Sequence, residues 1–530
     1  MESYDYIVIG AGSAGCTVAT RLIEAGKSVL LLEAGAKDNT PMIHVPAMFF
    51  RLIGTKRFWM YESNPEEGLK GNRTFFIPQG KTVGGGSSVN AMVYIRGQKE
   101  DYDGWRDMGC PGWGYDDVLP YFRKAEKNER LGAPYHGNDG HLSVSDCRYR
   151  HPLGYAFLRA AQQAGLPYND DFNGERQEGV GFYQNTIGAF RRASAAATYL
   201  KSVIGNPLLT LRTETLVSEI TMENGAAVGV RYGGKGSPGV EARAREEVIL
   251  CAGAMATPKI LMLNGIGPAD HLGEMGIQVR RELPGVGQNF HDHVAAQVSV
   301  ELSQPVGFFG QDRGLKAIRH GLEYLLFKRG ILASNLLETG GFISTDGTGR
   351  PDIQWHTIPV LSGDVGALPP QIHGMVLSPC VLRPKSRGYV KLRSTDPQDQ
   401  VSFSPRVLTE KEDVDTLIRG VKLTRKVFRQ EALKAFVKRE IAPGGPDELD
   451  DARIEEHIRT VAKTVYHPVG SCKMGTDAMA VVDPQLRVIG VPRLRVADAS
   501  VMPLVTSGNT NAPSIMIGER CADFVLRGAG

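Results

Sequence analysis

A glycine-rich turn at the start of the chain constrains its fold more than any other feature. Residues 6–9 form the apolar run Y-I-V-I, which is typical of a strand buried on both faces, and the sequence then reads G-A-G-S-A-G from Gly10 to Gly15. Apolar residues recur at helical spacing after this turn until Gly26. Because strand, turn and helix in this order open a βαβ unit, we predict that the turn surrounds a nucleotide.

Each position of this turn has a physical role in such a site. Gly10 allows the tight turn, Gly12 lets the backbone approach a pyrophosphate, and Gly15 lets the helix pack closely on the strand. The first helical residues, Ser13 and Ala14, bring unpaired backbone N–H groups toward the phosphates. Glycine-rich turns also serve purely structural ends, so the prediction depends on the strand that follows.

An acidic residue ends that second strand. Residues 29–32 read V-L-L-L, and Glu33 follows eighteen residues after Gly15, with Ala34 next to it. A carboxylate at this position accepts hydrogen bonds from a ribose diol and repels a 2′-phosphate. The motif therefore predicts an adenosine with free ribose hydroxyls, and it leaves open whether the cofactor is NAD or FAD.

The charge and the cysteine content argue against several other classes. A formal net charge of +3 over 530 residues, without a long basic run, argues against a nucleic-acid partner. No apolar stretch approaches the length of a transmembrane segment, and the first strand begins without a signal-peptide pattern. The seven cysteines include no C-x-x-C pair, which favours reduced thiols. We expect a cytoplasmic protein, with peripheral attachment to a membrane left open.

A second glycine cluster runs from Gly80 to Gly97 with the sequence G-K-T-V-G-G-G-S-S-V-N-A-M-V-Y-I-R-G. It is too rich in glycine for a helix interior or a central strand, so we expect it to wrap around a flat or anionic group. A flexible linker is the alternative, but a linker would not carry the apolar residues Val89, Met92 and Ile95. The preceding residues 36–79 are predicted to be a loop-rich cover over the nucleotide domain.

The middle of the chain mixes strand and helix patterns. Residues 101–127 and 141–190 are predicted to be insertions, and residues 208–253 to be antiparallel strands that return to the nucleotide domain. Thr257 suits an N-cap and Pro258 the first helical position, so we expect a helix to begin there. A separate sheet domain is predicted for residues 297–455, with strands at 352–358 and 388–393 and an amphipathic helix at 411–438.

Two polar runs near the C-terminus form the candidate chemical site. The first contains Tyr466 and His467, and the second extends from Ser507 to Glu519. A neutral imidazole at about pH 7 can take the proton of an alcohol, so His467 is our candidate base; a histidine that only ends a strand is the alternative. Capping residues at 509–511, followed by Pro513, predict a helix whose positive N-terminal end favours the negative charge of a reduced flavin.

Together these motifs resemble the glucose-methanol-choline (GMC) oxidoreductases, which are FAD-dependent alcohol oxidases and dehydrogenases. The resemblance covers essentially the whole chain and rests on six stretches: residues 6–35, 80–97, 253–267, 466–468, 498–499 and 509–513. It implies that His467 is the catalytic histidine and that Asn511 holds the substrate oxygen. It also implies FAD contacts at Val83, Gly85, Asn90, Ala91, Met92, Val93, Val217, Asp498, Ala499, Asn511, Ala512 and Pro513.

Some positions depart from the family pattern or narrow it. Asn264 replaces a serine of the family, which we expect the turn to tolerate. Val89 stands where choline oxidase binds its flavin covalently through histidine, so the resemblance implies non-covalent FAD. Residues 332–342 resemble choline dehydrogenase-like enzymes, including those acting on L-sorbose and polyethylene glycol. Glu338 matches a carboxylate that helps choline oxidase to hold its substrate, so we assign Glu338 and Tyr466 to the substrate, with a structural acceptor as the alternative for Glu338.

The sequence gives little support for a metal site or a serine-hydrolase site. His291, Asp292 and His293 have side chains that ligate metals, but no further ligand occurs at a suitable spacing to complete a site, so we expect no metal. No G-x-S-x-G elbow of a serine hydrolase is present.

The predicted fold class is α/β, with a Rossmann-like FAD-binding domain and a second, α+β substrate-binding domain built on an antiparallel sheet. The FAD-binding domain is expected to comprise residues 1–150, 193–296 and 456–530. The substrate-binding domain is expected to comprise residues 151–192 and 297–455.

The predicted reaction is the FAD-dependent oxidation of a primary alcohol to the aldehyde, with neutral alcohols, sugars or glycols favoured. His467 removes the hydroxyl proton, and a hydride passes to flavin N5. Choline oxidation is the near alternative, and an NAD-dependent dehydrogenase or a non-catalytic flavin-binding module are the distant ones. The electron acceptor (a quinone, another carrier or O₂) is left open, and the protein is expected to be a monomer or a homodimer.

Overall fold

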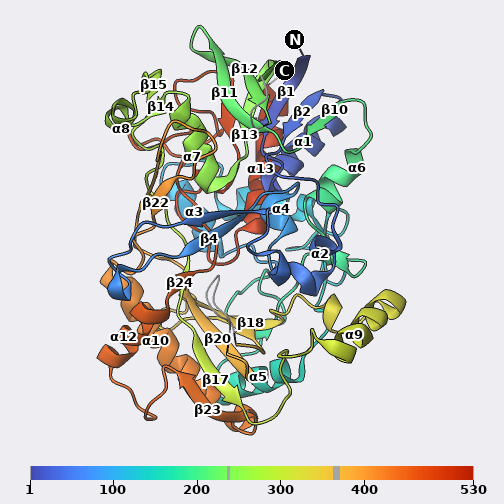
Figure 1. The fold of residues 1–530 in the computed structure, drawn as a ribbon, viewed down its shortest axis with the longest axis vertical. Helices are drawn as coiled ribbons and strands as arrows, with labels where there is room; N and C mark the ends of the chain where they lie inside the picture. The colour runs from blue at the N-terminus through green and yellow to red at the C-terminus, as the bar shows by residue number, and fades with distance from the viewer. Residues whose placement is uncertain (1, 235–238, 362–369, 529–530) are drawn as a thin grey trace.

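Two large β-sheets organise the computed structural model, which describes residues 2–234, 239–361 and 370–528. In Figure 1 the seven-stranded sheet lies in the upper half and the eight-stranded sheet in the lower half, and the chain crosses between them several times. Helices cover both sheets.

The seven-stranded sheet is Rossmann-like, as predicted. Its strand order is β10-β2-β1-β13-β12-β11, and β25 also pairs with β13. Five strands pair in parallel: β1 (Glu2–Ile9), β2 (Val29–Leu32), β10 (Leu209–Arg212), β13 (Val240–Leu250) and β25 (Leu494–Val496). Two further strands extend the sheet in antiparallel pairing: β11 (Leu216–Glu223) and β12 (Ala226–Gly233).

The prediction that residues 208–253 form antiparallel strands is correct for β11, for β12 and for the first part of β13, which pairs with β12, and it is wrong for β10. β10 lies parallel to β2, and β13 also lies parallel to β1. Long crossover segments, and not tight turns, separate β2 from β10 and β1 from β13 along the chain. β13 also uses one edge twice, because its residues 240–243 pair with β12 and its residues 248–250 with β25.

Helices α1 (Ser13–Glu24) and α13 (Asn511–Gly528) pack closely against each other beside this sheet. Gly518 permits the contact, because a Cβ atom at that position would lie 2.8 Å from the carbonyl oxygen of Ala14. The fully buried Glu519 accepts hydrogen bonds from Arg21 at 2.8–3.0 Å and from the Tyr199 hydroxyl at 2.7 Å. Lys124 of α4 (Tyr115–Ala125) adds an ion pair to Glu519 at 3.1 Å.

The eight-stranded sheet is antiparallel throughout, as predicted for the second domain. Its strands are β23 (Val437–Ala442), β17 (Val298–Leu302), β20 (Gly374–Val381), β19 (Ile353–Ile358), β18 (Thr339–Ile343) and β7 (Gly179–Phe182) in this order. In addition, β16 (Val294–Ala295) pairs with β20, and β24 (Lys463–Thr464) pairs with β16.

Helices cover the outer side of this sheet, where α5 (Pro152–Gln163) and α10 (Lys411–Phe428) contact its strands and α12 (Asp451–Val461) packs on α10. Side chains alternate along β19. Trp355 faces α5, with its ring centroid 6.1 Å from that of Phe157, whereas His356 and Ile358 line a cavity on the other side. The sheet therefore separates a helical layer from the cavity.

Three local predictions need correction. Residues 36–79 are not only a loop-rich cover, because α2 (Pro41–His44), η1 (Pro46–Leu52) and an antiparallel hairpin of β3 (Phe58–Glu62) and β4 (Phe76–Gly80) lie there. The strand predicted at 388–393 is β21 (Tyr389–Lys391), which pairs with β22 (Ser402–Ser404) outside the main sheet. The helix predicted at 411–438 ends at Phe428, and α11 (Glu431–Lys434) and β23 follow.

The helix predicted to begin at Thr257 begins earlier, as α7 (Gly253–Leu263). Its first N–H group, on Gly253, donates to Asp498 Oδ2 at 2.9 Å, and the Thr257 hydroxyl donates to the same oxygen at 2.6 Å. A carboxylate from the distant β25 region thus caps the helix, so Thr257 lies in its second turn.

The remaining elements are short, apart from helices α3 and α9. They are η2 (Lys70–Asn72), η3 (Gly85–Ser88), α3 (Lys99–Asp107), β5 (Glu126–Asn128), β6 (Leu142–Val144), β8 (Ile187–Gly188), β9 (Arg191–Arg192), η4 (Ala196–Leu200), α6 (Lys201–Val203), β14 (Ile266–Gly267), α8 (Ala269–Glu274), β15 (Arg281–Glu282), α9 (Gly314–Phe327), η5 (Ile331–Ala333) and η6 (Ala499–Val501). All seven cysteines are buried free thiols. The domain boundaries given above stay a prediction.

We expect Glu519→Gln to lower the free energy of unfolding by about 3 kcal/mol, because it leaves the Arg21 guanidinium without its buried counter-charge. The matched control is Asp415→Asn, which removes the exposed Lys411–Asp415 ion pair and should cost less than about 0.5 kcal/mol. Urea unfolding followed by tryptophan fluorescence measures both. Equal costs would contradict the importance of the Glu519 network.

Candidate active site

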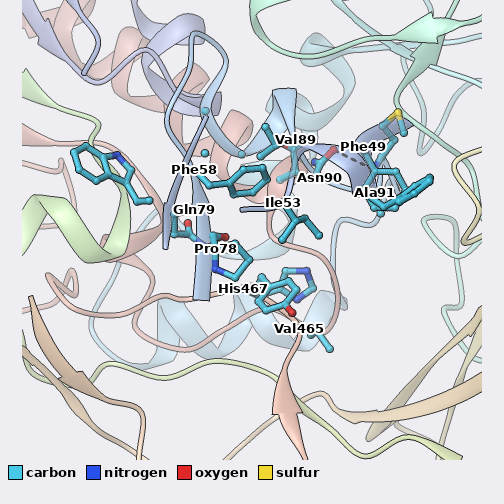
Figure 2. A pocket seen from close by; sticks show the side chains of 18 of the residues that line it. Phe49, Ile53, Phe58, Pro78, Gln79, Val89, Asn90, Ala91, Val465 and His467 are labelled. Atoms are coloured by element: carbon cyan, nitrogen blue, oxygen red, sulfur yellow. Dashed lines mark hydrogen bonds between the residues drawn. The ribbon is translucent and has the colours of Figure 1, made fainter. Parts of the chain in front are cut away.

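A cavity of about 1280 Å³ is lined by residues of both sheets. Gly10 and Glu33 at the ends of β1 and β2 form part of its wall, and His356 and Ser378 of the eight-stranded sheet form another part. Figure 2 shows side chains of the β3–β4 hairpin, such as Phe58 and Pro78, around the same cavity as His467.

Most of the residues predicted for cofactor, catalysis or substrate line this cavity. They are Gly10, Gly12, Ser13, Ala14, Glu33, Ala34, Gly85, Asn90, Ala91, Met92, Val93, Val217, Tyr466, His467, Asp498, Ala499 and Asn511. Five predicted residues lie behind the wall: Gly15, Val83, Glu338, Ala512 and Pro513. Ala512 and Pro513 belong to the first turn of α13, whose neighbouring residues Asn511 and Ser514 do face the cavity.

The geometry of the N-terminal turn fits the three predicted glycine roles. Gly10 has a φ of +101°, and a Cβ atom there would lie 2.5 Å from the carbonyl oxygen of Cys251. A Cβ atom at Gly15 would lie 1.9 Å from the carbonyl oxygen of Gly10, so only glycine allows α1 to approach the strand. A Cβ atom at Gly12 would meet no atom closer than the carbonyl oxygen of Cys251, at 3.8 Å, and no side chain caps α1. The start of α1 is therefore open to an anionic group in the cavity.

Glu33 is buried at the end of β2 and braces this turn. Its Oε2 accepts a hydrogen bond from the Ala11 N–H group at 3.0 Å, and its Oε1 accepts one from the Gly35 N–H group at 2.7 Å. Burial raises the pKa of Glu33 to about 7.

The second glycine segment packs directly on the first. The Gly84 N–H group donates to the carbonyl oxygen of Ala11 at 2.6 Å, and a Cβ atom at Gly85 would lie 2.7 Å from Gly12 Cα. Met92 adopts a left-handed backbone conformation with φ of +59° where the segment turns along the cavity. The segment therefore lines the cavity and is not a flexible linker, and the flat or anionic group that it is expected to hold stays a prediction.

The pairing of β16 with β24 positions His467 in the site. These two-residue strands bring residues 289–295 alongside residues 463–470, so that His293 and His467 meet although 174 residues separate them. The backbone N–H group of His467 donates to Asp292 Oδ1 at 2.8 Å. The preceding residue, Tyr466, has φ of +69°, a strained conformation for a bulky side chain that helps to turn His467 toward the cavity.

A chain of hydrogen bonds determines which nitrogen of His467 carries hydrogen. His293 Nε2 lies 3.0 Å from the carbonyl oxygen of Leu382, which can only accept, so this nitrogen must donate. His293 Nδ1 is then an acceptor, and it lies 3.0 Å from His467 Nδ1, which must therefore carry the hydrogen. His467 Nε2 is left with a lone pair, and it accepts a hydrogen bond from Asn509 Nδ2 at 3.0 Å.

The orientation of the Asn509 amide is fixed independently. Asn509 Oδ1 accepts a hydrogen bond from Gln354 Nε2 at 3.1 Å, which leaves the NH₂ group for His467. Both His467 and Asn509 line the cavity. The site thus presents a basic nitrogen and an amide donor side by side.

Burial keeps the imidazoles of this site neutral. It lowers the pKa of His467 well below its usual range, and the nearby His293 and His356 lower it further. It also lowers the pKa of His293 and that of His356 to about 4 each. Burial raises the pKa of the neighbouring Asp292 carboxyl to about 8. At neutral pH His467 is therefore an unprotonated base.

The structure does not pair His467 with the predicted Asn511. Asn511 Oδ1 instead accepts a hydrogen bond from the Ser13 hydroxyl at 2.8 Å and joins the start of α13 to the start of α1. Asn509 takes the place beside His467, and Asn509 and Thr510 line the cavity directly before α13 begins at Asn511. The sequence pattern groups residues 509–511 as capping residues, and the family resemblance assigns the substrate oxygen to Asn511, so neither predicts this place for Asn509.

Glu338 is not brought to the cavity either. Its buried carboxylate accepts hydrogen bonds from the His151 N–H group and the Ser334 hydroxyl, both at 2.6 Å. Burial raises its pKa to about 7. This geometry supports the alternative reading of Glu338 as a structural acceptor.

Several site residues were missed by sequence reasoning. The sequence pattern indicates His293 and Asp292 only as metal ligands, and it does not mark His356 or Asn509 as site residues. The His-Asp-His run was the available signal, because adjacent imidazole and carboxyl groups in one segment are as typical of a proton-relay site as of a metal site. Across residues 2–234, 239–361 and 370–528, no cluster of three or more His, Cys, Asp or Glu residues is arranged to hold a metal ion.

A Rossmann-like turn that opens into a cavity with a buried, neutral histidine defines a nucleotide-cofactor-dependent oxidoreductase. Residues 4–295 and 384–518 match the sequence profiles of GMC oxidoreductase. The chain belongs to the GMC oxidoreductase family and is a FAD-dependent enzyme of the alcohol dehydrogenase or oxidase type. In the part of the chain that the structure describes, no helix has the length and apolar character needed to cross a membrane.

Related proteins are similar over their full length. The chain is 42% identical to the alcohol dehydrogenase (acceptor) of Pseudomonas putida, over 99% of this chain and 96% of that protein. It is 44% identical to the mitochondrial choline dehydrogenase of Homo sapiens, over 99% and 90% respectively. Among solved structures, pyridoxine 4-oxidase from Mesorbium loti superimposes with a TM-score of 0.88 at 29% identity, over 98% of both chains.

We expect Asn509→Ala to slow flavin reduction by an alcohol about 100-fold, because it removes the amide donor beside His467. Asn511→Ala is the matched variant. It should instead weaken FAD binding about tenfold, because the Ser13 hydroxyl loses its acceptor. Stopped-flow reduction and FAD titration of the apoprotein measure the two effects. If the two variants exchanged these phenotypes, Asn511 would be restored as the catalytic partner.

Proposed function

We propose that this protein oxidises a neutral primary alcohol to the aldehyde with non-covalently bound FAD, and that His467 and Asn509 act on the hydroxyl group. The observation that carries the proposal is the hydrogen-bond chain from Leu382 through His293, which leaves the lone pair of His467 Nε2 directed at the Asn509 amide in the cavity wall.

The cavity wall suits FAD at three places. Glu33 stands where a ribose diol would bind, and the open start of α1 at Ser13 and Ala14 suits a pyrophosphate. The start of α13 and most residues of the glycine-rich stretch 85–93 line the same cavity as His467. Val89 in this wall has no nucleophilic atom to bond a flavin. When bound, FAD supplies the hydride acceptor.

His467 and Asn509 together fit an alcohol hydroxyl. The hydroxyl donates to the lone pair of Nε2 and accepts from Asn509 Nδ2, so it replaces the hydrogen bond that these two groups now share. As the carbon loses its hydride, Nε2 takes the hydroxyl proton and the aldehyde forms. The imidazolium formed at His467 keeps its Nδ1–H bond to His293 Nδ1, which stabilises the positive charge.

Apolar side chains in the cavity wall favour uncharged, apolar substrates. Ile358, Val360, Leu336 and Leu337 line the cavity, as does Ala295 of β16. Apolar side chains supply binding energy for an alkyl chain and none for a solvated charge.

The carboxylates among the described residues of the cavity wall are engaged elsewhere. Glu33 and Asp498 accept backbone N–H groups, and Asp312 pairs with Arg51 at 3.2 Å. A quaternary ammonium group in the cavity would therefore have no free counter-charge among these three carboxylates. This disfavours choline, although the human choline dehydrogenase is 44% identical.

An anaerobic screen tests the substrate class. We expect linear primary alcohols to bleach the bound flavin at least about tenfold faster than choline at equal concentration, because each buried methylene adds favourable transfer free energy. Absorbance of the flavin follows the reduction. Choline as the fastest substrate would contradict the neutral class, and a flavin that no alcohol bleaches would contradict the enzymatic proposal as a whole.

Variants of the histidine pair test the mechanism. His467→Ala should slow flavin reduction by about 10²- to 10⁴-fold with FAD still bound, because the base is lost. His293→Leu should slow it less, by about tenfold, because His467 keeps its basic nitrogen but loses the acceptor that fixes its tautomer. His293→Gln offers an amide oxygen as the acceptor and should recover most of the rate. Equal rates for Leu and Gln at 293 would remove His293 from the mechanism.

A further inference from the structure

Helix α9 (Gly314–Phe327) exposes more large apolar side chains than other elements of the described chain. Leu315 is 84% exposed and Leu326 is 68% exposed. The other exposed members are Ile318, Leu322, Leu325 and Phe327. In Figure 1 the helix projects at the right-hand side of the molecule, away from both sheets. Exposed apolar groups of this density are a binding surface and not an ordinary solvated face.

Five of the six exposed apolar residues form one stripe. At about 100° per residue, Leu315, Ile318, Leu322, Leu325 and Leu326 fall within an arc of about 100° on the helix surface. The protein-facing side of the helix consists of other residues. The buried Tyr324 donates its hydroxyl hydrogen to the carbonyl oxygen of Phe190 at 2.8 Å, and His320 Nε2 lies 3.1 Å from Gln311 Oε1. These contacts hold the helix with its apolar stripe outward.

Cations accompany the stripe. Residues 313–329 contain five, Arg313, Lys316, Arg319, Lys328 and Arg329, against the single carboxylate of Glu323, which gives an excess of four positive charges. Arg319 lies at the edge of the apolar arc, and the others lie toward the two ends of the helix or on its flank. An apolar stripe bordered by lysine and arginine is the pattern of a helix that lies in a membrane interface.

We propose that α9 binds the surface of an anionic lipid bilayer, with its leucine stripe among the acyl chains and its cations at the headgroups. The helix has 14 residues, too few to cross a bilayer but enough to lie along its surface. A second copy of the chain fits this surface poorly, because a twofold interface would bring two sets of these cations together. Lipid phosphates supply the opposite charge.

The same helix stands at the active-site cavity. Ala317 and His320 of α9 line the cavity, together with residues 308–313 that lead into the helix. On the facing side lie Phe50 and Ile53, which are themselves partly exposed, and the Arg51–Asp312 ion pair joins the two sides. Docking through α9 would therefore place this part of the cavity wall next to the lipid. The docking itself does not depend on the proposed function; access of lipid-dissolved alcohols or acceptors to the cavity does.

Vesicle binding of the FAD-loaded enzyme tests the proposal without an activity measurement. The enzyme should sediment with vesicles of phosphatidylcholine and phosphatidylglycerol, and at least about tenfold less with vesicles of phosphatidylcholine alone. Leu322→Glu and Leu325→Glu should each reduce binding to the anionic vesicles about tenfold. The matched control is Ile204→Glu, which alters an apolar residue of similar exposure outside α9 and should bind like the parent. Arg319→Glu, with Lys201→Glu as its control, tests the charge.

Three results would overturn the proposal. One is the absence of binding to anionic vesicles by the parent enzyme at low salt. A second is binding that the α9 variants and their controls reduce equally. The third is a lipid-free dimer, measured by analytical ultracentrifugation, that Leu322→Glu converts to monomer, because the stripe would then be covered by a second copy. Flavin absorbance and circular dichroism of each variant check that the fold and the FAD content are intact.

Discussion

Parallel pairing of β1, β13 and β25 is the constraint on which the rest of the structure depends. Parallel neighbours cannot be joined by a tight turn, so the chain must leave this sheet after each strand and return by a long path. The excursion between β13 and β25 contains most of the antiparallel sheet. Parallel strands also end at the same edge, which places Gly10, Gly253 and Asp498 together, directly beyond the three strands. The cavity lies at this edge, where α/β proteins generally bind their ligands.

Features that depend on local sequence could be predicted, and features that depend on distant partners could not. The glycines of residues 10–15 and the start of α13 follow from backbone sterics and capping within a few residues, and the structure agrees with both. Thr257 looked like an N-cap because the actual cap, Asp498, is 241 residues further along. Asn509 and Asn511 are chemically identical and two residues apart, and only their partners His467 and Ser13 distinguish them. An antiparallel sheet is expected for the second domain from its strand patterns and the family resemblance, whereas the order of its strands depends on long-range register.

The buried histidines illustrate how a fold can prepare a base without a neighbouring carboxylate anion. The backbone carbonyl of Leu382 fixes the tautomer of His293, and His293 fixes the tautomer of His467. Desolvation keeps each ring neutral, so the basic nitrogen is available rather than already protonated. The arrangement suits the oxidation of an alcohol, in which the oxygen loses a proton and the carbon loses a hydride. The relatives that match over the full chain include alcohol and choline dehydrogenases.

The burial of all seven cysteines has a practical consequence for the redox behaviour of the protein. Burial raises the pKa of Cys110 to about 11 and that of Cys521 to about 12, and it raises the pKa of Cys251 far above its usual range. Thiols that are both shielded and protonated are poor nucleophiles, so peroxide and alkylating reagents have little to attack while the chain is folded. Modification of these thiols would thus report opening of the protein interior. It would report on both sheets, because Cys251 directly follows β13 of the seven-stranded sheet and Cys380 lies in β20 of the eight-stranded sheet.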